Sequence, residues 1–320
     1  MSEIGGYFEM EAANGKAYHN AAIALNSGRH CLEYILRKRN ISKIYIPEFM
    51  CYTVAAVCNK CRCNYEYYPI QRNFLPDLKK EPGNGEYVYL VNYYGQLSNK
   101  ILGGLARKYR NVIVDNVQAF FQMPLEGIDT IYSCRKFFGV PDGGYLYTTL
   151  AVPENMNRDV SYERMKFVLG RYEQGANVFF KEASQNNTFF DHEPVKLMSK
   201  ITENILKGVD YQIAIEKRKR NFNILHKYLD GINELSIVCP EGPFMYPFYA
   251  RNGAIFREKL IAKKIYIPCL WGDVFDVAHS DSVAWEYAGN ILPLPCDHRY
   301  GKAEMEYIIE NIVEGGRYDY

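Results

Sequence analysis

The first half of the sequence alternates short apolar runs with longer amphipathic ones, and this alternation restricts the possible fold more than any other feature. Short apolar or aromatic runs that end near Gly, Pro or Asn are typical of strands. These runs are AAIALN, SKIYIP, CNYEYYPI, EYVYLVNYYG, NVIVDN, IDTIYS and GGYLYTTL. The segments between them that are typical of helices are SGRHCLEYILRKRN, CYTVAAVCNK and NKILGGLARKYR. Because alternating strands and helices build mostly parallel sheets covered on both faces, the sequence predicts an α/β fold.

The second half changes character after about residue 153. Polar sequence of helical type continues to about residue 208, and VDYQIAIEKRKRNFNILHKYLDG then predicts a long helix with one apolar stripe and a solvated basic face. The tail predicts short strands at ELSIVCP, FMYPFYA, KKIYIPCLW and ILPLP, and a closing helix at AEMEYIIENIV. We therefore predict a large domain at 1–208 and a small α+β domain at 209–320.

Charge and hydropathy argue against two classes of partner. The net charge of +1 over 320 residues gives no reason to expect nucleic acid, and the EKRKR cluster is typical of a solvated helix face. No apolar run approaches the ~20 residues that a membrane span needs. The N-terminal MSEIGGYFEMEAANG carries early acids and lacks a signal pattern. We expect a cytoplasmic protein whose partners are small molecules.

The cysteines agree with a reducing compartment. Nine cysteines, an odd number scattered through the chain, indicate free thiols rather than a disulfide framework. Cys58, Cys61 and Cys63 are close enough in sequence to suggest a metal site, but no second Cys or His pair follows at a familiar spacing. Free thiols are therefore favoured over a structural metal, and no metal site is predicted.

The first candidate site is the strand-to-helix junction LNSGRH. Ligands of open α/β sheets bind outside the carboxyl ends of the strands. The free N–H groups and the dipole of a helix that begins at Gly28 favour a phosphate, and glycine permits its close approach. A simple helix cap by Ser27 is the alternative interpretation.

The second candidate is VDNVQAF, where Asp115 ends an apolar strand. Its carboxylate is suited to a helix cap or an ion pair, and equally to holding the pyridinium N–H of a cofactor so that the ring stays cationic. Gln118 follows three residues later and could donate a hydrogen bond to a ring oxygen.

The third candidate is YSCRKFFGVPDGGYL. A lysine in such a turn is commonly a surface cation. Shielded from water by Phe137 and Phe138, however, the Lys136 amine becomes nucleophilic, as Schiff-base chemistry requires, and Ser133 adds a hydroxyl. The glycines that would permit a tight turn and a close approach are Gly139, Gly143 and Gly144. Arg135 has no assigned role.

A phosphate-binding helix start, a later acid and a lysine about twenty residues beyond it are what pyridoxal phosphate needs from a protein. With these parts in order, the sequence resembles the fold type I pyridoxal-phosphate enzymes, and among them the DegT-type sugar-nucleotide aminotransferases. The matching segments are NSGRHCLEYIL, YIPEFMCYTVAAV, LVNYYGQLSN, VDNVQAF, YSCRKFFGVPDGGYL, RNFNILHKYL and ILPLPCDHRYGKAEMEYIIENI. They span most of the chain.

The resemblance implies a role for each motif residue. Lys136 would bind the cofactor as a Schiff base, and Asp115 would keep the pyridine nitrogen protonated. Gly28, Arg29 and Ser133 would bind the cofactor phosphate, and Gln118 would bind the ring hydroxyl. Tyr52 or, less favoured, Phe49 would cover one face of the cofactor ring. The family also implies a homodimer with active sites at its interface. The expected reaction moves an amino group from an amino acid, glutamate by resemblance, to a nucleotide-linked keto-sugar for a surface polysaccharide.

The sequence departs from the family at three points. Arg29 replaces the usual Thr, and Asn92 stands where many members have His. The Asn that members lend to the partner subunit's phosphate has only Asn186 or Asn187 as a counterpart. Two alternatives therefore stay open: a pyridoxal-phosphate enzyme with a non-sugar keto substrate, and a non-catalytic regulatory protein that binds the cofactor or a sugar.

Overall fold

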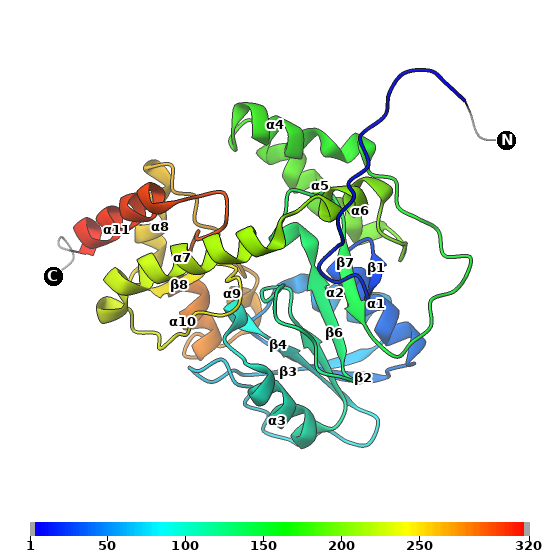
Figure 1. Cartoon of the computed structure of the whole chain (residues 1–320). Coiled ribbons are helices and arrows are strands. Elements are labelled where there is room, and N and C mark those ends of the chain that lie inside the picture. The colour runs from blue at the N-terminus through cyan, green and yellow to red at the C-terminus, as the bar shows by residue number, and fades with distance from the viewer. Residues whose placement is uncertain (1–3, 317–320) are drawn as a thin grey trace.

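A seven-stranded mixed sheet forms the centre of the computed structural model, which describes residues 4–316 (Figure 1). Its strands are β1 (Ile23–Leu25), β2 (Lys43–Pro47), β3 (Asn64–Tyr68), β4 (Tyr87–Val91), β5 (Val112–Asp115), β6 (Asp129–Ser133) and β7 (Gly144–Tyr147). They lie in the order β1-β7-β6-β5-β4-β2-β3. Neighbouring strands in the part of the sheet that runs β6-β5-β4-β2-β3 are parallel to each other. The strand β7, in contrast, runs antiparallel to both of its neighbours, β1 and β6. The predicted α/β fold with a mostly parallel sheet is confirmed.

The helices of the first half begin and end where the sequence predicts. They are α1 (Gly28–Lys38), α2 (Tyr52–Lys60) and α3 (Asn99–Tyr109). The side chains of Ser27 and Ser98 accept hydrogen bonds from the first turns of α1 and α3, which satisfies N–H groups that have no acceptor inside the helix. The apolar stripe of α1 is buried, and its Arg37 and Lys38 lie in the last turn, where the helix dipole favours cations.

The second half is mainly helical. Its helices are α4 (Lys166–Gln174), α5 (Phe180–His192), α6 (Lys200–Lys207), α7 (Tyr211–Leu229), α8 (Gly253–Ala262), α9 (Val274–Val277), α10 (Val283–Asn290) and α11 (Lys302–Gly316). Figure 1 shows α4 standing away from the main sheet, and α7 leading from the sheet to the C-terminal elements. The predicted boundary after residue 208 falls between α6 and α7, and the division into two domains stays a prediction.

Two predicted strands are wrong, because ELSIVCP and KKIYIPCLW form no strand. In this part of the chain β8 (Tyr246–Tyr249) pairs only with β9 (Ile291–Leu294). The Gln96 side chain takes the place of a neighbouring strand for Val238, donating to its carbonyl at 2.9 Å and accepting from its N–H at 2.8 Å. Ile265 and Ile267 are buried, so the apolar pattern around them reflects core packing rather than strand pairing.

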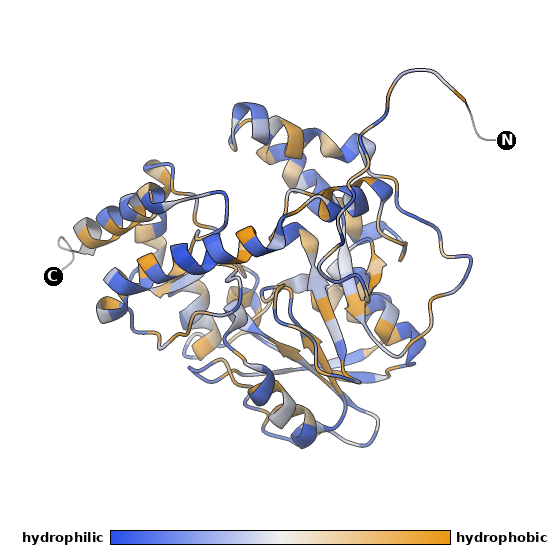
Figure 2. Cartoon of the chain, viewed as in Figure 1, coloured by the Kyte–Doolittle hydropathy of each residue, from blue (hydrophilic) through white to orange (hydrophobic). Residues whose placement is uncertain are grey.

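The basic face of α7 is only partly solvated. Figure 2 shows mostly hydrophilic residues along this helix, and Lys217 and Arg220 are exposed. Arg218, in contrast, is only 1% exposed, which corrects the prediction that the whole EKRKR cluster faces water. Within residues 4–316, no helix is both long and apolar enough to cross a membrane.

Two glycines, one just before β7 and one at its first position, allow this strand to lie against the start of α1. Gly143 has a φ of 110°, a conformation that L side chains rarely adopt. A Cβ on Gly144 would lie 2.5 Å from the carbonyl carbon of Ser27 and 2.7 Å from the nitrogen of Gly28. The close approach predicted for these glycines is thus present, although Gly139 has only ordinary contacts.

We predict that Gly144→Ala lowers the free energy of unfolding by about 1–3 kcal/mol, the usual cost of overpacking, because β7 and the start of α1 must move apart. Gly104→Ala in α3 is the matched control. Its added methyl group meets no atom within 4 Å, so we expect it to stabilise the protein by about 0.4–1 kcal/mol. Urea unfolding of both variants measures the difference, and equal stabilities would contradict the proposed backbone contact.

Candidate functional site

A cavity of about 400 Å³ lies where β5 and β6 end and α1 begins. It is lined by Ser27, Gly28, Arg29, Leu32, Cys51, Thr53, Val54, Tyr89, Asp115, Val117, Ser133, Arg135, Lys136, Asn187, Phe244 and Leu270. The tertiary structure therefore brings together five residues that the sequence analysis selected, namely Gly28, Arg29, Asp115, Ser133 and Lys136. Parallel strands explain this convergence, because their carboxyl ends meet at one edge of a sheet.

The start of α1 is held in place by a buried hydrogen-bond chain. Ser27 caps the helix by accepting from the N–H of His30, and its hydroxyl lies 2.9 Å from Nδ1 of the same residue. Burial lowers the pKa of His30 to about 4, so the imidazole is neutral at pH 7. Its Nε2 must donate to the carbonyl of Glu193 at 3.0 Å, and Nδ1 therefore accepts from Ser27. The cap thus orients the first turn, whose N–H groups favour an anion in the cavity.

Asp115 is a buried carboxylate at the end of β5. Its Oδ2 accepts from the hydroxyl of Tyr89 at 2.7 Å, and its Oδ1 accepts from the N–H of Val117 at 2.8 Å. Burial raises the pKa of Asp115, while these two hydrogen bonds and the charge of Lys136 oppose the rise. A buried carboxylate of this kind is stabilised further by a cationic N–H donor, which makes Asp115 a suitable partner for a protonated ring nitrogen.

Lys136 ends the 3-10 turn Cys134–Lys136 that follows β6. The expected shielding by Phe137 and Phe138 is wrong, because Lys136 is exposed while both rings are buried and pack against Phe120. The aromatic ring that faces the lysine belongs instead to Phe244, whose centroid lies 5.5 Å from Nζ. This contact joins segments more than a hundred residues apart, so local sequence could not reveal it.

Arg135 is the cavity residue that the sequence analysis left without a role. Its guanidinium donates to Oδ1 of Asn187 and lies 4.8 Å from the centroid of the Phe190 ring, and it forms no ion pair within residues 4–316. Burial lowers the pKa of Arg135 to about 10, and the nearby charges of Arg29 and Arg164 act in the same direction. The charge of Asp142 opposes this shift, but the guanidinium forms no ion pair with that carboxylate, so Arg135 is suited to an anionic ligand.

Arg29 differs from Arg135 in having a counter-charge. Its guanidinium forms an ion pair with Asp191, so its side chain is already neutralised by the protein itself. Asn187 lines the cavity of its own chain, whereas Asn186 is buried and donates to the carbonyl of Pro141 at 2.8 Å. The predicted contact of one of them with a partner subunit's phosphate stays a prediction.

Four residues from the family motifs lie outside the cavity lining. Tyr52 is 50% exposed and its hydroxyl donates to Asp191 at 3.3 Å, while Phe49 is buried against Trp271. The other two residues, Asn92 and Gln118, are buried. The Asn92 side chain forms hydrogen bonds with Asn116, Gln122 and Leu97. The Gln118 side chain accepts from the N–H of Tyr94 at 2.7 Å. The ring contacts assigned to Tyr52 and Gln118 stay predictions.

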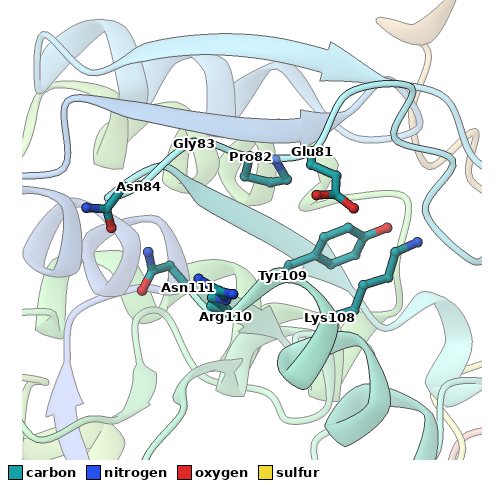
Figure 3. Close-up of a pocket in the computed structure, with 8 residues that line it drawn as sticks. All are labelled: Glu81, Pro82, Gly83, Asn84, Lys108, Tyr109, Arg110 and Asn111. Carbon is teal, nitrogen blue, oxygen red and sulfur yellow. The ribbon is translucent and has the colours of Figure 1, made fainter.

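A second hollow of about 240 Å³ lies where β4 and β5 begin. It is lined by Glu81, Pro82, Gly83, Asn84, Lys108, Tyr109, Arg110 and Asn111 (Figure 3). None of the predicted site residues lines it. Among residues 4–316, no cluster of three or more His, Cys, Asp or Glu side chains could hold a metal ion, and Cys58, Cys61 and Cys63 are free thiols.

Comparisons with known proteins give structural matches only. No protein-family model and no curated protein sequence matches the chain. The solved structures that are similar include a DegT DnrJ EryC1 StrS aminotransferase from Brucella abortus, with 14% identity, a TM-score of 0.62 and coverage of 92% of this chain and 85% of that one. The sugar aminotransferase CalS13 from Micromonospora echinospora has 14% identity, a TM-score of 0.63 and coverage of 92% and 88%.

A third similar structure is NtdA from Bacillus subtilis with bound cofactor PMP, at 14% identity, a TM-score of 0.60 and coverage of 92% and 72%. These matches extend over most of each chain. The chain therefore has the fold of these aminotransferases, the α/β architecture of fold type I pyridoxal-phosphate enzymes.

Proposed function

We propose that this protein is a pyridoxal-phosphate-dependent aminotransferase that acts on a sugar. The observation that carries the proposal is the cavity, in which an exposed lysine, a buried carboxylate and an unpaired arginine meet beside a helix start. Lys136, Asp115 and Arg135 would supply an amine, an acceptor for a cationic N–H and a counter-charge for a phosphate. Similar structures include a sugar aminotransferase and a protein with bound PMP, which supports the same cofactor and substrate class here.

The polar groups left unsatisfied around the site fit this cofactor. Arg135 has no ion pair in the described part of the chain, and the phosphate would supply one. Gln118 lies outside the cavity lining, but its Nε2 atom is buried without a hydrogen-bond partner among residues 4–316, and this donor would suit a ring hydroxyl. Asp115 faces the cavity with its charged form disfavoured by burial, a cost that a pyridinium N–H would offset.

The cofactor, when bound, supplies an electron-withdrawing ring that makes a C–H bond next to an amine acidic. Lys136 would hold the cofactor covalently through Nζ. The same Nζ amine would also act as the base and acid that moves a proton at the substrate carbon. Asp115 would keep the ring nitrogen protonated. The first turn of α1 at Gly28 and Arg29, the Ser133 hydroxyl and Arg135 would bind the phosphate.

The finer parts of the function rest on the sequence resemblance. These are glutamate as amino donor, a nucleotide-linked keto-sugar as acceptor and a surface polysaccharide as the end use. The cytoplasmic location is proposed on a different ground, the scattered free cysteines. The alternatives are a non-sugar keto substrate and a non-catalytic protein that binds the cofactor or a sugar. Retention of Lys136 at the cavity favours catalysis over the last of these.

A homodimer is part of the proposal, and exposed apolar side chains on and beside α4 and α5 support it. Tyr172 is 94% exposed and Phe180 is 75% exposed, and Leu169 and Val178 are exposed near them in sequence. Helices that present several large apolar groups to water are typical of an interface with another chain. A second copy would cover them.

We predict that the protein takes up pyridoxal phosphate and turns yellow, and that Lys136→Ala does not. Borohydride should remove the colour from the wild type and leave the cofactor attached to the Lys136 peptide, as mass spectrometry would show. Lys227→Ala is the matched control, because its Nζ likewise lies over an aromatic ring, at 5.4 Å from Tyr228. A wild-type protein that binds no pyridoxal phosphate would contradict the proposed function. Loss of colour on adding glutamate, with release of 2-oxoglutarate, distinguishes transamination from binding alone.

We also predict that Arg135→Gln weakens pyridoxal phosphate binding roughly tenfold to hundredfold, the range for a hydrogen bond to a charged group. Affinity for pyridoxal, which lacks the phosphate, should change far less. Arg29→Gln should have the smaller effect of the two, because Asp191 already neutralises Arg29. Equilibrium dialysis with both ligands provides the comparison, and equal losses for pyridoxal and its phosphate would show that Arg135 does not bind the phosphate.

For the dimer, we expect Phe180→Glu to shift the solution mass from that of two chains toward one, because it places a charge in an apolar contact. Light scattering after gel filtration measures this mass. Ile255→Glu is the control, since it alters an exposed apolar residue of α8, away from α4 in Figure 1. A monomeric wild type would contradict the dimer.

A further inference from the structure

Arg218 of α7 is a fully buried cation with no carboxylate partner in the part of the chain that the structure describes. It is 1% exposed, and its donors reach carbonyl oxygens and one imidazole nitrogen instead. Burial lowers the pKa of Arg218 to about 10, although the nearby carboxylate of Asp297 opposes the shift, so the group still carries its charge at pH 7. Burying a charge that forms no ion pair is costly even with Asp297 nearby, and an apolar side chain of similar volume would often be as stable at such a position. We therefore expect this arginine to do more than fill space in the core.

The guanidinium joins two segments that face the cavity. Its Nη2 donates to the carbonyl of Phe137 at 3.0 Å, and its Nη1 donates to the carbonyl of Pro243 at 2.9 Å and that of Phe244 at 3.5 Å. The plane of the group also lies 4.7 Å from the centroid of the Phe137 ring. The planar fork of arginine can hold several acceptors in one fixed geometry, which the single ammonium of lysine cannot.

Both anchored segments belong to the surroundings of Lys136. Phe137 is the next residue along the chain, and Phe244 contributes the ring that lies 5.5 Å from the lysine Nζ. The same side chain thus restrains the backbone that carries the amine and the backbone that carries its aromatic neighbour. We propose that Arg218 is a positioning residue that holds the Lys136 turn against Phe244. This inference rests on the proposed function for its catalytic consequence, but its geometric part does not.

A third segment completes the arrangement. The Nε of Arg218 donates to Nδ1 of His298 at 3.1 Å, which requires a neutral imidazole, and burial lowers the pKa of His298 to about 4. Asn221, one turn further along α7, holds the same loop by donating to the carbonyls of Asp297 and Tyr300, both at 3.0 Å. Asn221 therefore shares the structural role of Arg218 without touching Phe137 or Phe244.

The test compares Arg218→Lys with Asn221→Ala. The first probe is cofactor-free protein treated briefly with limiting acetic anhydride, with acetylation of Lys136 measured by mass spectrometry. Acetylation should rise in Arg218→Lys, because the ring and the turn are no longer held together, and should match the wild type in Asn221→Ala. The second probe is the cofactor-loaded protein with glutamate. Arg218→Lys should lower kcat roughly tenfold or more with little change in KM, the result of a misplaced reacting group.

The outcomes separate the two proposals. Unchanged Lys136 acetylation in folded Arg218→Lys overturns the positioning role, and so does an equal rise in Asn221→Ala. If Arg218→Lys fails to fold, Phe244→Leu takes its place, because it removes the ring but keeps the carbonyl that Arg218 binds. Acetylation of Lys136 must then rise in Phe244→Leu, and no rise again overturns the proposal. A wild type that takes up no pyridoxal phosphate overturns the proposed function instead, while the acetylation result remains valid.

Discussion

The close backbone contact between β7 and the start of α1 determines where everything else in the site can lie. Gly144 approaches Ser27 and Gly28 at distances that no side chain would allow. Because β7 also pairs with β6, this contact brings the helix start next to Ser133 at the end of β6. The start of α1, where we propose that the phosphate binds, and the lysine turn thereby share one cavity, although more than a hundred residues separate them in the chain.

Charged side chains of the cavity lie at the ends of two neighbouring strands. Asp115 lies at the end of a central strand, where its carboxylate is satisfied by Tyr89 and a backbone N–H, and the cations Lys136 and Arg135 lie in the turn after the neighbouring strand. A ligand with a cationic ring nitrogen and an anionic phosphate matches this order. Arg218 adds a further cation behind the turn, bound only to carbonyls and an imidazole, so that it orients the backbone without competing for the ligand.

The sequence predicted the sheet well because strand and helix periodicities differ strongly where strands are buried on both faces. It predicted the tail less well. Ile265 and Ile267 have the apolar pattern of a strand, yet they pack into the core without a neighbouring strand to pair with. The side chain of Gln96 bonds to the backbone carbonyl and N–H of Val238, groups that the local pattern would pair with a neighbouring strand. Similarly, Arg218 resembles its basic neighbours in sequence, and only its acceptors from distant segments distinguish it.

The sequence by itself determined the α/β class, the order of the elements in the first half and the selection of Gly28, Asp115, Ser133 and Lys136, because these follow from local periodicity and from motifs at strand ends. Only the tertiary structure decided that Arg29 forms an ion pair while Arg135 forms none among residues 4–316, that Phe244 rather than Phe137 or Phe138 faces Lys136, and that Arg218 is buried. These features depend on contacts between residues far apart in the chain. The free energy of each contact depends on which charges and rings lie close together in the folded chain, and local sequence does not specify this.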